Sequence, residues 1–154
     1  MKAKLIVALF CLGLFSIFAH EADAQKRRSR VRRSPSAAAI TTPSGLTYLI
    51  TKKGTGSQLK AGDTVIMQYT GMLTNGFKFD SSYDRNQPFA FKLGVGQVIK
   101  GFDEGLAKLR IGDHAILVIP GKLAYGPKGI PNFIPPDSTL IFVIEVVDVK
   151  PNPL

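Results

Sequence analysis

Apolar and polar residues alternate along much of the chain from residue 45 onward, which is typical of half-buried β-strands. The alternation predicts six strands, over residues 45–52, 63–73, 77–80, 89–93, 114–119 and 139–149. In the second of these, Val65, Met67 and Tyr69 fall on one face. The dipeptide Asn75-Gly76 favours a tight hairpin turn, so the strands on either side of it are expected to pair antiparallel.

The apolar spacing changes to three and four residues over 98–109, which predicts one amphipathic helix. Its apolar face would comprise Val98, Ile99, Phe102, Leu106 and Leu109. The acidic side chains of Asp103 and Glu104 suit the positive end of the helix dipole, and Gly112 is a suitable stop. Six strands and one helix predict an α+β domain, in which an antiparallel sheet of five to six strands packs on one short helix.

The segment 120–137 is rich in proline and glycine, which predicts a loop. It also carries Tyr125, Ile130, Phe133 and Ile134, so we expect a rigid apolar rim rather than a polar, solvated loop.

The last strand has two apolar faces. Leu140, Phe142, Ile144 and Val146 are expected to face the core. On the opposite face, where polar residues are usual, the chain has mainly Ile141, Val143, Val147 and Val149. Three explanations remain open: the segment 37–46 covers this face, a partner or a second copy covers it by self-association, or it is ordinary surface variation.

The N-terminus has the pattern of a secretory signal peptide. Lys2 and Lys4 precede an apolar run over residues 5–19, and Ala22-Asp23-Ala24 offers a small-residue cleavage site. We therefore expect residues 1–24 to be removed and the protein to be exported, to the periplasm or outside the cell. An uncleaved membrane anchor is the alternative, although the run is shorter than the roughly 20 residues that span a bilayer. Cys11 lies in this run, so the mature chain would have no thiol.

The positive charge of the chain is concentrated in a short stretch. Of the formal net charge of +9, residues 25–33 contribute six basic side chains: Lys26, Arg27, Arg28, Arg30, Arg32 and Arg33. We expect residues 25–39 to be a flexible basic tail and 40–154 to be the folded domain. The tail would either contact an anionic surface or serve as a solvated linker. Because the domain itself is nearly balanced in charge, specific nucleic-acid binding is not expected.

Residues for covalent, metal or cofactor chemistry are scarce. His114 is the only histidine after residue 24, and no nucleophile-elbow motif surrounds any serine. Gly94-Val95-Gly96 lacks the third glycine of a dinucleotide fingerprint, and the acidic residues are scattered. No cofactor or metal ion is therefore expected.

Several segments resemble the FKBP-type peptidyl-prolyl cis-trans isomerases. They are YTGML (69–73), FDSS (79–82), DRNQPF (84–89), LGVGQVIKGFDEGL (93–106), AYG (124–126) and IPPDSTLIF (134–142). The resemblance spans about residues 43–149 in family order. It implies a sheet half-wrapped around the helix and an apolar pocket between them. It also implies binding of proline-containing polypeptides and of macrolide inhibitors.

The resemblance also implies roles for individual residues. The catalytic positions would be Asp80, Tyr69, Tyr125 and Phe102. The substrate-binding positions would be Phe79, Arg85, Phe89, Val98, Ile99, Ile130, Phe133, Ile134 and Phe142. The expected activity is rotation about X–Pro bonds in exported proteins, through desolvation and twisting of the amide without a covalent intermediate. The alternative is a weakly catalytic chaperone or scaffold of the same fold. Phe102 stands where the family usually has tryptophan, so weaker macrolide binding is expected.

Overall fold

The computed structural model describes residues 38–152. The predicted signal peptide 1–24 and the predicted tail, apart from residues 38 and 39, lie outside the described residues. The division of the chain into these parts therefore stays a prediction. Within the described range, no helix is long and apolar enough to cross a membrane.

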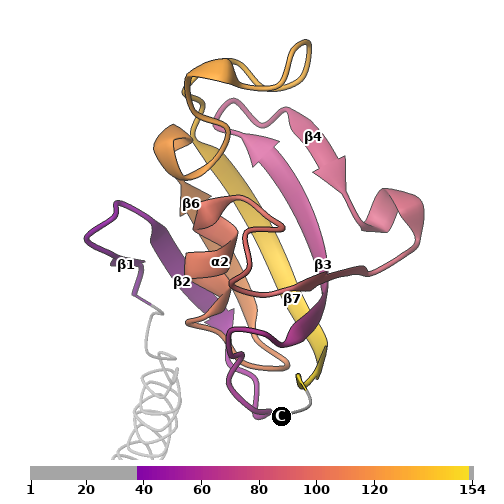
Figure 1. Ribbon diagram of the computed structural model, residues 1–154. Coiled ribbons are helices and arrows are strands. Elements are labelled where there is room, and N and C mark those ends of the chain that lie inside the picture. The colour runs from indigo at the N-terminus through magenta and orange to yellow at the C-terminus, as the bar shows by residue number, and fades with distance from the viewer. Residues whose placement is uncertain (1–37, 153–154) are drawn as a thin grey trace, which may run out of the picture. The chain divides into compact units, whose positions relative to one another are not determined.

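The described residues form one curved antiparallel sheet and one α-helix, as the alternation and the single amphipathic segment predicted (Figure 1). The strands are β1 (Ile40–Thr41), β2 (Thr47–Lys52), β3 (Thr64–Leu73), β4 (Lys78–Ser81), β5 (Phe89–Lys92), β6 (His114–Ile119) and β7 (Leu140–Lys150). The helices are α2 (Lys100–Leu106) and the short 3₁₀ turns η1 (Tyr83–Arg85), η2 (Gly121–Leu123) and η3 (Gly126–Lys128). All six predicted strands are present, and β1 is an additional short strand.

The strand order is β1-β2-β6-β7-β3-β4. On one side β3 pairs with β7 along its whole length. On its other side, β5 pairs with the first half of β3 and β4 pairs with the second half. The Asn75-Gly76 turn joins β3 to β4 as predicted, with Gly76 at a φ of 87°, a conformation that glycine adopts readily.

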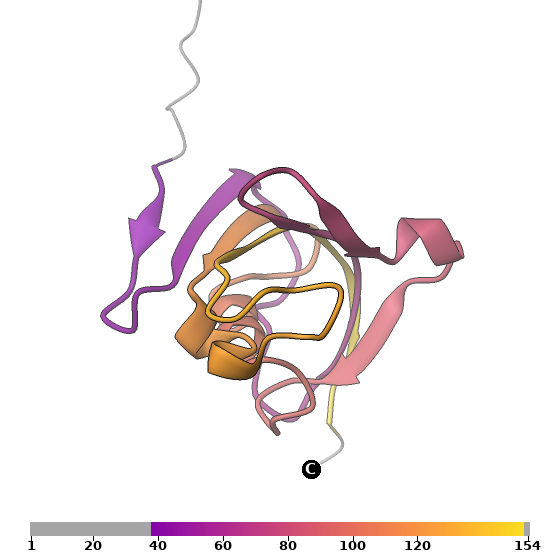
Figure 2. The same cartoon turned by 90° about the horizontal axis from the view of Figure 1, so that it is seen from above.

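The helix α2 packs on the concave face of the sheet, and the strands curve around it (Figure 2). Fully buried side chains from both layers form the core between them, among them Leu106 of α2, Leu117 of β6 and Ile144 of β7. The approach is close because α2 presents glycines to β6. A Cβ at Gly101 would come closer than 3.0 Å to the Ile119 side chain, and one at Gly105 would lie 2.8 Å from Leu117.

The predicted bounds of the helix, 98–109, are wrong at both ends. Ile99 is extended, with φ −60° and ψ 148°, so the helix begins at Lys100. After Leu106 the chain continues in a tighter turn, where the Leu109 N–H donates to the Leu106 carbonyl at 2.9 Å. This turn keeps Leu109 buried, so the apolar spacing continues beyond the helix. Gly112 lies in the turn before β6 and does not end the helix.

One residue of β7 faces a different side from the one predicted. Leu140, Phe142, Ile144 and Val146 are buried as expected, whereas Val149 packs against the core instead of facing outward. Met67 pairs with Val146 but Ile66 pairs with Asp148, so Val147 is the extra residue of a β-bulge. An extra residue reverses the side that every later residue faces, which explains Val149.

The segment 38–46 does not cover the outer face of β7. Its strand β1 pairs with β2 at the edge of the sheet, and both β2 and β6 separate it from β7. Val143 and Val147 are each 44% exposed in the described part of the chain. Self-association through this face stays a prediction, which sedimentation of the chain from residue 25 would test.

The glycine contact between α2 and β6 can be tested by Gly101→Ala. In an open helix alanine would stabilise by about 1 kcal/mol. Here the added methyl group meets Ile119, so we expect the free energy of unfolding to fall by about 1–3 kcal/mol in urea denaturation. In an Ile119→Ala background the methyl group has room, and the same change should cost much less. An equal cost in both backgrounds would contradict this account.

Candidate functional site

One cavity of about 630 Å³ opens between α2, the sheet and the loop after β6. Ten of the thirteen residues predicted for the site line it: Tyr69, Phe79, Asp80, Arg85, Phe89, Val98, Ile99, Phe102, Tyr125 and Phe142. These residues come from β3, β4, η1, β5, α2, β7 and two loops, so the fold brings distant parts of the chain together.

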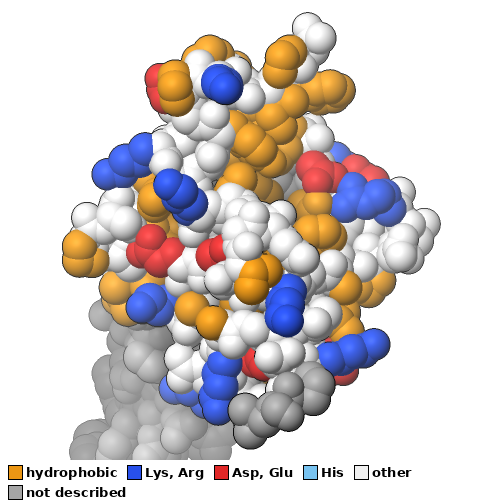
Figure 3. Space-filling view, in the orientation of Figure 1, with side chains coloured by type: hydrophobic (Ala, Val, Ile, Leu, Met, Phe, Trp, Pro, Cys, Tyr) orange, Lys and Arg blue, Asp and Glu red, His pale blue; other side chains and the backbone are white. Residues whose placement is uncertain are grey.

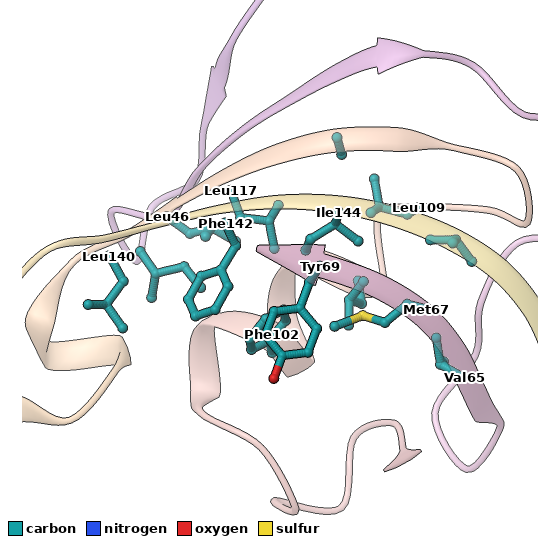
Figure 4. Packing of buried hydrophobic residues seen from close by; sticks show 14 of the residues in the cluster. Leu46, Val65, Met67, Tyr69, Phe102, Leu109, Leu117, Leu140, Phe142 and Ile144 are labelled. Atoms are coloured by element: carbon teal, nitrogen blue, oxygen red, sulfur yellow. The ribbon is translucent and has the colours of Figure 1, made fainter. Parts of the chain in front are cut away.

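Aromatic rings form the walls and the floor of the cavity. The rings of Phe102 and Phe142 are 4.5 Å apart between centroids, and the Tyr69 ring lies 6.3 Å from Phe102 and 6.0 Å from Phe142 (Figure 4). Phe79 packs edge-on against Phe142 at 5.6 Å, and Phe89 packs edge-on against Tyr69 at 5.7 Å. Such contacts hold each ring in place, so the cavity has a defined apolar shape.

Gly71 of β3 makes room for two of these rings. A Cβ at this position would lie 2.7 Å from both the Phe79 ring and the Phe142 ring. Any side chain at Gly71 would therefore move one of these rings, and the shape of the cavity depends on the glycine.

Asp80, Tyr69 and Arg85 form the one charged group of the cavity. The Tyr69 hydroxyl donates to one oxygen of the Asp80 carboxylate, and the Arg85 guanidinium donates to the other. Arg85 also donates to the Tyr69 hydroxyl oxygen at 3.0 Å and lies 5.8 Å from the centre of the Tyr69 ring. Both Asp80 oxygens thus have partners, and each member of the group fixes the other two.

These contacts hold the group in one protonation state. Burial by itself would raise the pKa of Asp80, but the hydrogen bonds from Tyr69 and Arg85 outweigh it and hold the pKa below its ordinary value. Burial, with the adjacent Asp80 carboxylate, raises the pKa of Tyr69 and of Tyr125. The carboxylate is therefore ionised and both phenols are neutral at ordinary pH.

Ser82 holds this group at the point where the edge of β3 is interrupted. The strand β3 pairs with β5 before this point and with β4 after it. Here the Tyr69 N–H donates to the Ser82 hydroxyl at 2.9 Å, and the Ser82 N–H donates to the Tyr69 carbonyl at 3.0 Å. Ser82 is fully buried, and the chain then turns through η1, which carries Arg85. The Ser82 hydroxyl satisfies the Tyr69 N–H, which has no strand neighbour at this point. The chain can therefore leave the sheet here and place Arg85 against Tyr69.

Asp103 shapes the turn before α2. Its carboxylate accepts hydrogen bonds from the N–H groups of Gly94 at 2.8 Å and Gly96 at 3.1 Å. Glu104 likewise accepts a hydrogen bond from the Ser44 hydroxyl, at 2.8 Å and 2.7 Å to its two oxygens. Asp103 lies in the first turn of α2, as the dipole argument predicts. In addition, Asp103 and Glu104 each hold a specific segment of chain against α2.

Two hydrogen-bond donors at the cavity remain available to a ligand. The N–H of Ile99, which precedes the first turn of α2, has no partner within the described residues. Tyr125 is 38% exposed, and its hydroxyl likewise has no hydrogen-bond partner in the described part of the chain. A peptide carbonyl is the natural acceptor for such donors.

Three predicted site residues do not line this cavity. Ile130, Phe133 and Ile134 border a separate hollow of about 260 Å³ at the tip of the loop after β6. Ile134 is buried in the core, whereas Phe133 is 58% exposed. The expected apolar rim is therefore formed only in part, because Ile134 does not reach the surface. The hydrophobic side chains that are exposed at this end occupy the upper part of the face in Figure 3.

The sequence missed several residues that line or support the cavity. Gly96 and Gln97 line it, and Ser82 and Gly71 support it. All four lie in the segments that resemble the family, which is the one signal that could have found them. His114 lies elsewhere, with its Nε2 atom 3.8 Å from Glu145. The neighbouring Asp113 is buried and accepts hydrogen bonds from backbone N–H groups, so it does not pair with the histidine.

Comparison with known proteins gives one consistent match. A family profile described as "FKBP-type peptidyl-prolyl cis-trans isomerase" matches residues 55–147. "FK506-binding protein 1" of Saccharomyces cerevisiae is 58% identical over 91 residues, which are 59% of this chain and 80% of the yeast protein. "Peptidyl-prolyl cis-trans isomerase" of Schizosaccharomyces pombe is 47% identical over 107 residues, 69% of this chain and 96% of that protein. The crystal structure of AtFKBP13 superposes with a TM-score of 0.70 at 38% identity, covering 73% of this chain and 99% of that one.

Proposed function

Since the chain belongs to the family of FKBP-type peptidyl-prolyl cis-trans isomerases, we propose that its aromatic cavity binds X–Pro segments and accelerates rotation about their imide bond. The observation that carries this proposal is the convergence of Phe79, Phe102, Tyr125 and Phe142 on one open cavity. A proline ring is apolar and compact, and a floor of packed rings suits it.

The cavity suits a reaction in which no bond is made or broken. Rotation about the X–Pro amide has a barrier of about 18–20 kcal/mol, because twisting removes the resonance of the amide. Water favours the planar form, whose carbonyl oxygen carries more negative charge than that of the twisted form. A site that excludes water and fits the twisted shape lowers the barrier. An acceleration of about 10³–10⁵ requires roughly 4–7 kcal/mol.

The polar groups would position the substrate rather than exchange protons with it. Asp80 already accepts from Tyr69 and Arg85, so it acts as a fixed negative charge beside the rotating amide. The Ile99 N–H and the Tyr125 hydroxyl would donate to substrate carbonyls on either side of the proline. These fixed donors and charges favour one twisted geometry without any change in protonation.

The activity is tested by measuring kcat/KM for cis-to-trans isomerisation of a blocked X–Pro peptide, with the chain from residue 25. Asp80→Ala leaves Tyr69 and Arg85 without their partner, so we expect a loss of about 10- to 100-fold. Tyr125→Phe removes one hydrogen bond, with an expected loss of about 2- to 10-fold.

The matched controls are Asp84→Ala and Tyr83→Phe, which remove the same groups from exposed positions outside the cavity. Both controls should retain full activity. If the parent protein does not accelerate the reaction, the proposed catalysis is refuted; equal losses in the controls would refute the assigned site.

The fixed protonation state predicts a flat pH profile. The pKa of Asp80 lies below its ordinary value of 3.8, and the pKa values of Tyr69 and Tyr125 lie above 10.0. We therefore expect kcat/KM to be constant between about pH 5 and pH 9. Below pH 3.8 the stabilisation from ionised Asp80 is lost as the carboxylate takes up a proton. A bell-shaped profile centred near pH 6.5, about the ordinary pKa of histidine, would contradict this mechanism.

The exposed ring of Phe133 and its hollow favour a second function, retention of Pro-containing segments with little turnover, as a chaperone or scaffold. Peptide binding that persists in variants without catalysis would support this second function.

We also infer that macrolides such as FK506 bind the cavity, with Phe102 supplying a smaller floor than tryptophan would. Inhibition of isomerisation by FK506 in the same assay tests this binding, and we expect the Phe102→Trp variant to bind FK506 more tightly than the parent. Equal affinity of the two proteins would refute the prediction that Phe102 weakens macrolide binding.

We infer further that the protein is exported to the periplasm or outside the cell, and that it acts there on other exported polypeptides. Lys2 and Lys4, the apolar run 5–19 and the small residues Ala22 and Ala24 support this proposal. In a secreting host, mass spectrometry of the full chain's product should give a mature form that begins at Gln25. Ala22→Arg should block the cleavage, whereas the same change at Ala37 should not. An unprocessed chain in the membrane fraction would instead identify residues 5–19 as an anchor.

A further inference from the structure

Basic side chains gather at one end of the domain, which we call the basic pole. It comprises Lys52, Lys53, Lys60, Lys92, Lys108, Arg110 and Lys150. The pairing of the strands places them together. Lys92 and Lys150 both pair with Thr64, one on each side of β3, and Lys52 pairs with His114 at the start of β6. Arg110 forms a bridge with Gln58 in the loop that carries Lys53 and Lys60. Figure 3 shows Lys and Arg side chains around the lower end of the domain.

Few exposed carboxylates offset these charges. Of the four acidic residues at the pole, Asp63 and Asp113 are buried and accept hydrogen bonds from backbone N–H groups. Asp148 is exposed, and Glu145 lies 3.8 Å from His114, with its side chain 41% exposed. The pole therefore has seven basic and four acidic residues, a net charge of +3. The remainder of residues 38–152 has five basic and five acidic residues, a net charge of zero. The small positive charge of the domain is thus concentrated at the pole.

The pole and the cavity lie at different ends of the sheet. Thr64, in the row of Lys92 and Lys150, precedes Tyr69 by five residues of β3, or about 16 Å. The loop with Tyr125 lies still further along, at the upper end in Figure 1, where β6 ends and β7 begins. A surface that contacts the pole therefore leaves the cavity open.

We propose that the basic pole docks the domain on an anionic phospholipid surface with the proline cavity facing away from it. The pole is made of strand ends and tight turns, and none of residues 52–63, 107–113 and 148–152 is aromatic. Single-stranded nucleic acids are bound through base stacking on aromatic side chains, and none is present here. Clusters of Lys and Arg side chains on a protein surface are attracted to anionic lipids, and the pole presents seven such residues.

The test measures partition of the chain from residue 25 onto vesicles. The chain from residue 25 keeps every strand, the helix and the whole buried core of the described residues. We expect binding to vesicles of phosphatidylcholine with 30% phosphatidylglycerol, roughly the anionic content that attracts basic proteins. We expect none to pure phosphatidylcholine, and we expect release by salt.

Two triple variants with the same change in charge locate the binding surface. Lys60, Lys108 and Lys150 at the pole, and Lys100, Lys122 and Lys128 elsewhere, are all exposed. Changing the first three to glutamine should lower the partition coefficient by at least about tenfold, since each charge near the surface contributes about fivefold. Changing the second three should have little effect, and peptide isomerisation should be unaffected by the pole variant.

Equal losses in the two triple variants would overturn the proposal, because binding would then follow net charge alone. Absence of binding, or binding that salt does not weaken, would also overturn it. Tighter binding to double-stranded DNA than to the anionic vesicles would assign the pole to nucleic acid instead. Because binding is measured without substrate, its failure is distinct from a failure of the proposed isomerase activity.

Discussion

The close approach of α2 to the concave face of the sheet is the constraint on which the cavity depends. Gly101 and Gly105 allow this approach, because side chains at either position would strike β6. It presses the Phe102 ring against Phe142, 4.5 Å away, while Tyr69 closes the third side. The same helix therefore completes the hydrophobic core with Leu106 and forms the floor of the site with Phe102. Stability and function share one packing interaction, and a change in the helix position would alter both.

The ionisable groups of the cavity keep one protonation state at ordinary pH. The Asp80 carboxylate is satisfied by two side chains that are themselves held by packing and by the Ser82 hydrogen bonds. Such a group cannot act as a base without breaking its own contacts, but it provides a fixed field at low reorganisation cost. The proposed rotation of an amide, which transfers no proton, is the kind of reaction that a static arrangement can accelerate.

The sequence predicted what depends on local pattern and missed what depends on contacts between distant residues. Alternation located every predicted strand, and the family segments brought ten site residues to one cavity. Spacing alone did not reveal that Leu109 stays buried through a tighter turn, or that a bulge at Val147 reverses Val149. The position of Asp103 at the start of the helix was predicted, but its hydrogen bonds with the N–H groups of Gly94 and Gly96 were not. Ile134 looked like rim because the prolines around it suggest exposure, although its side chain fills the core.

The antiparallel sheet also separates two kinds of surface that would interfere if they lay together. The cavity end carries aromatic rings, and the proposed rotation of the amide depends on their exclusion of water. The other end carries exposed lysines, and the proposed docking depends on their hydrated, flexible side chains. The strand β3 reaches from one end to the other, with Thr64 beside Lys92 and Lys150 and Tyr69 in the cavity. The two surfaces are therefore built on the same strand but lie about 16 Å apart along it.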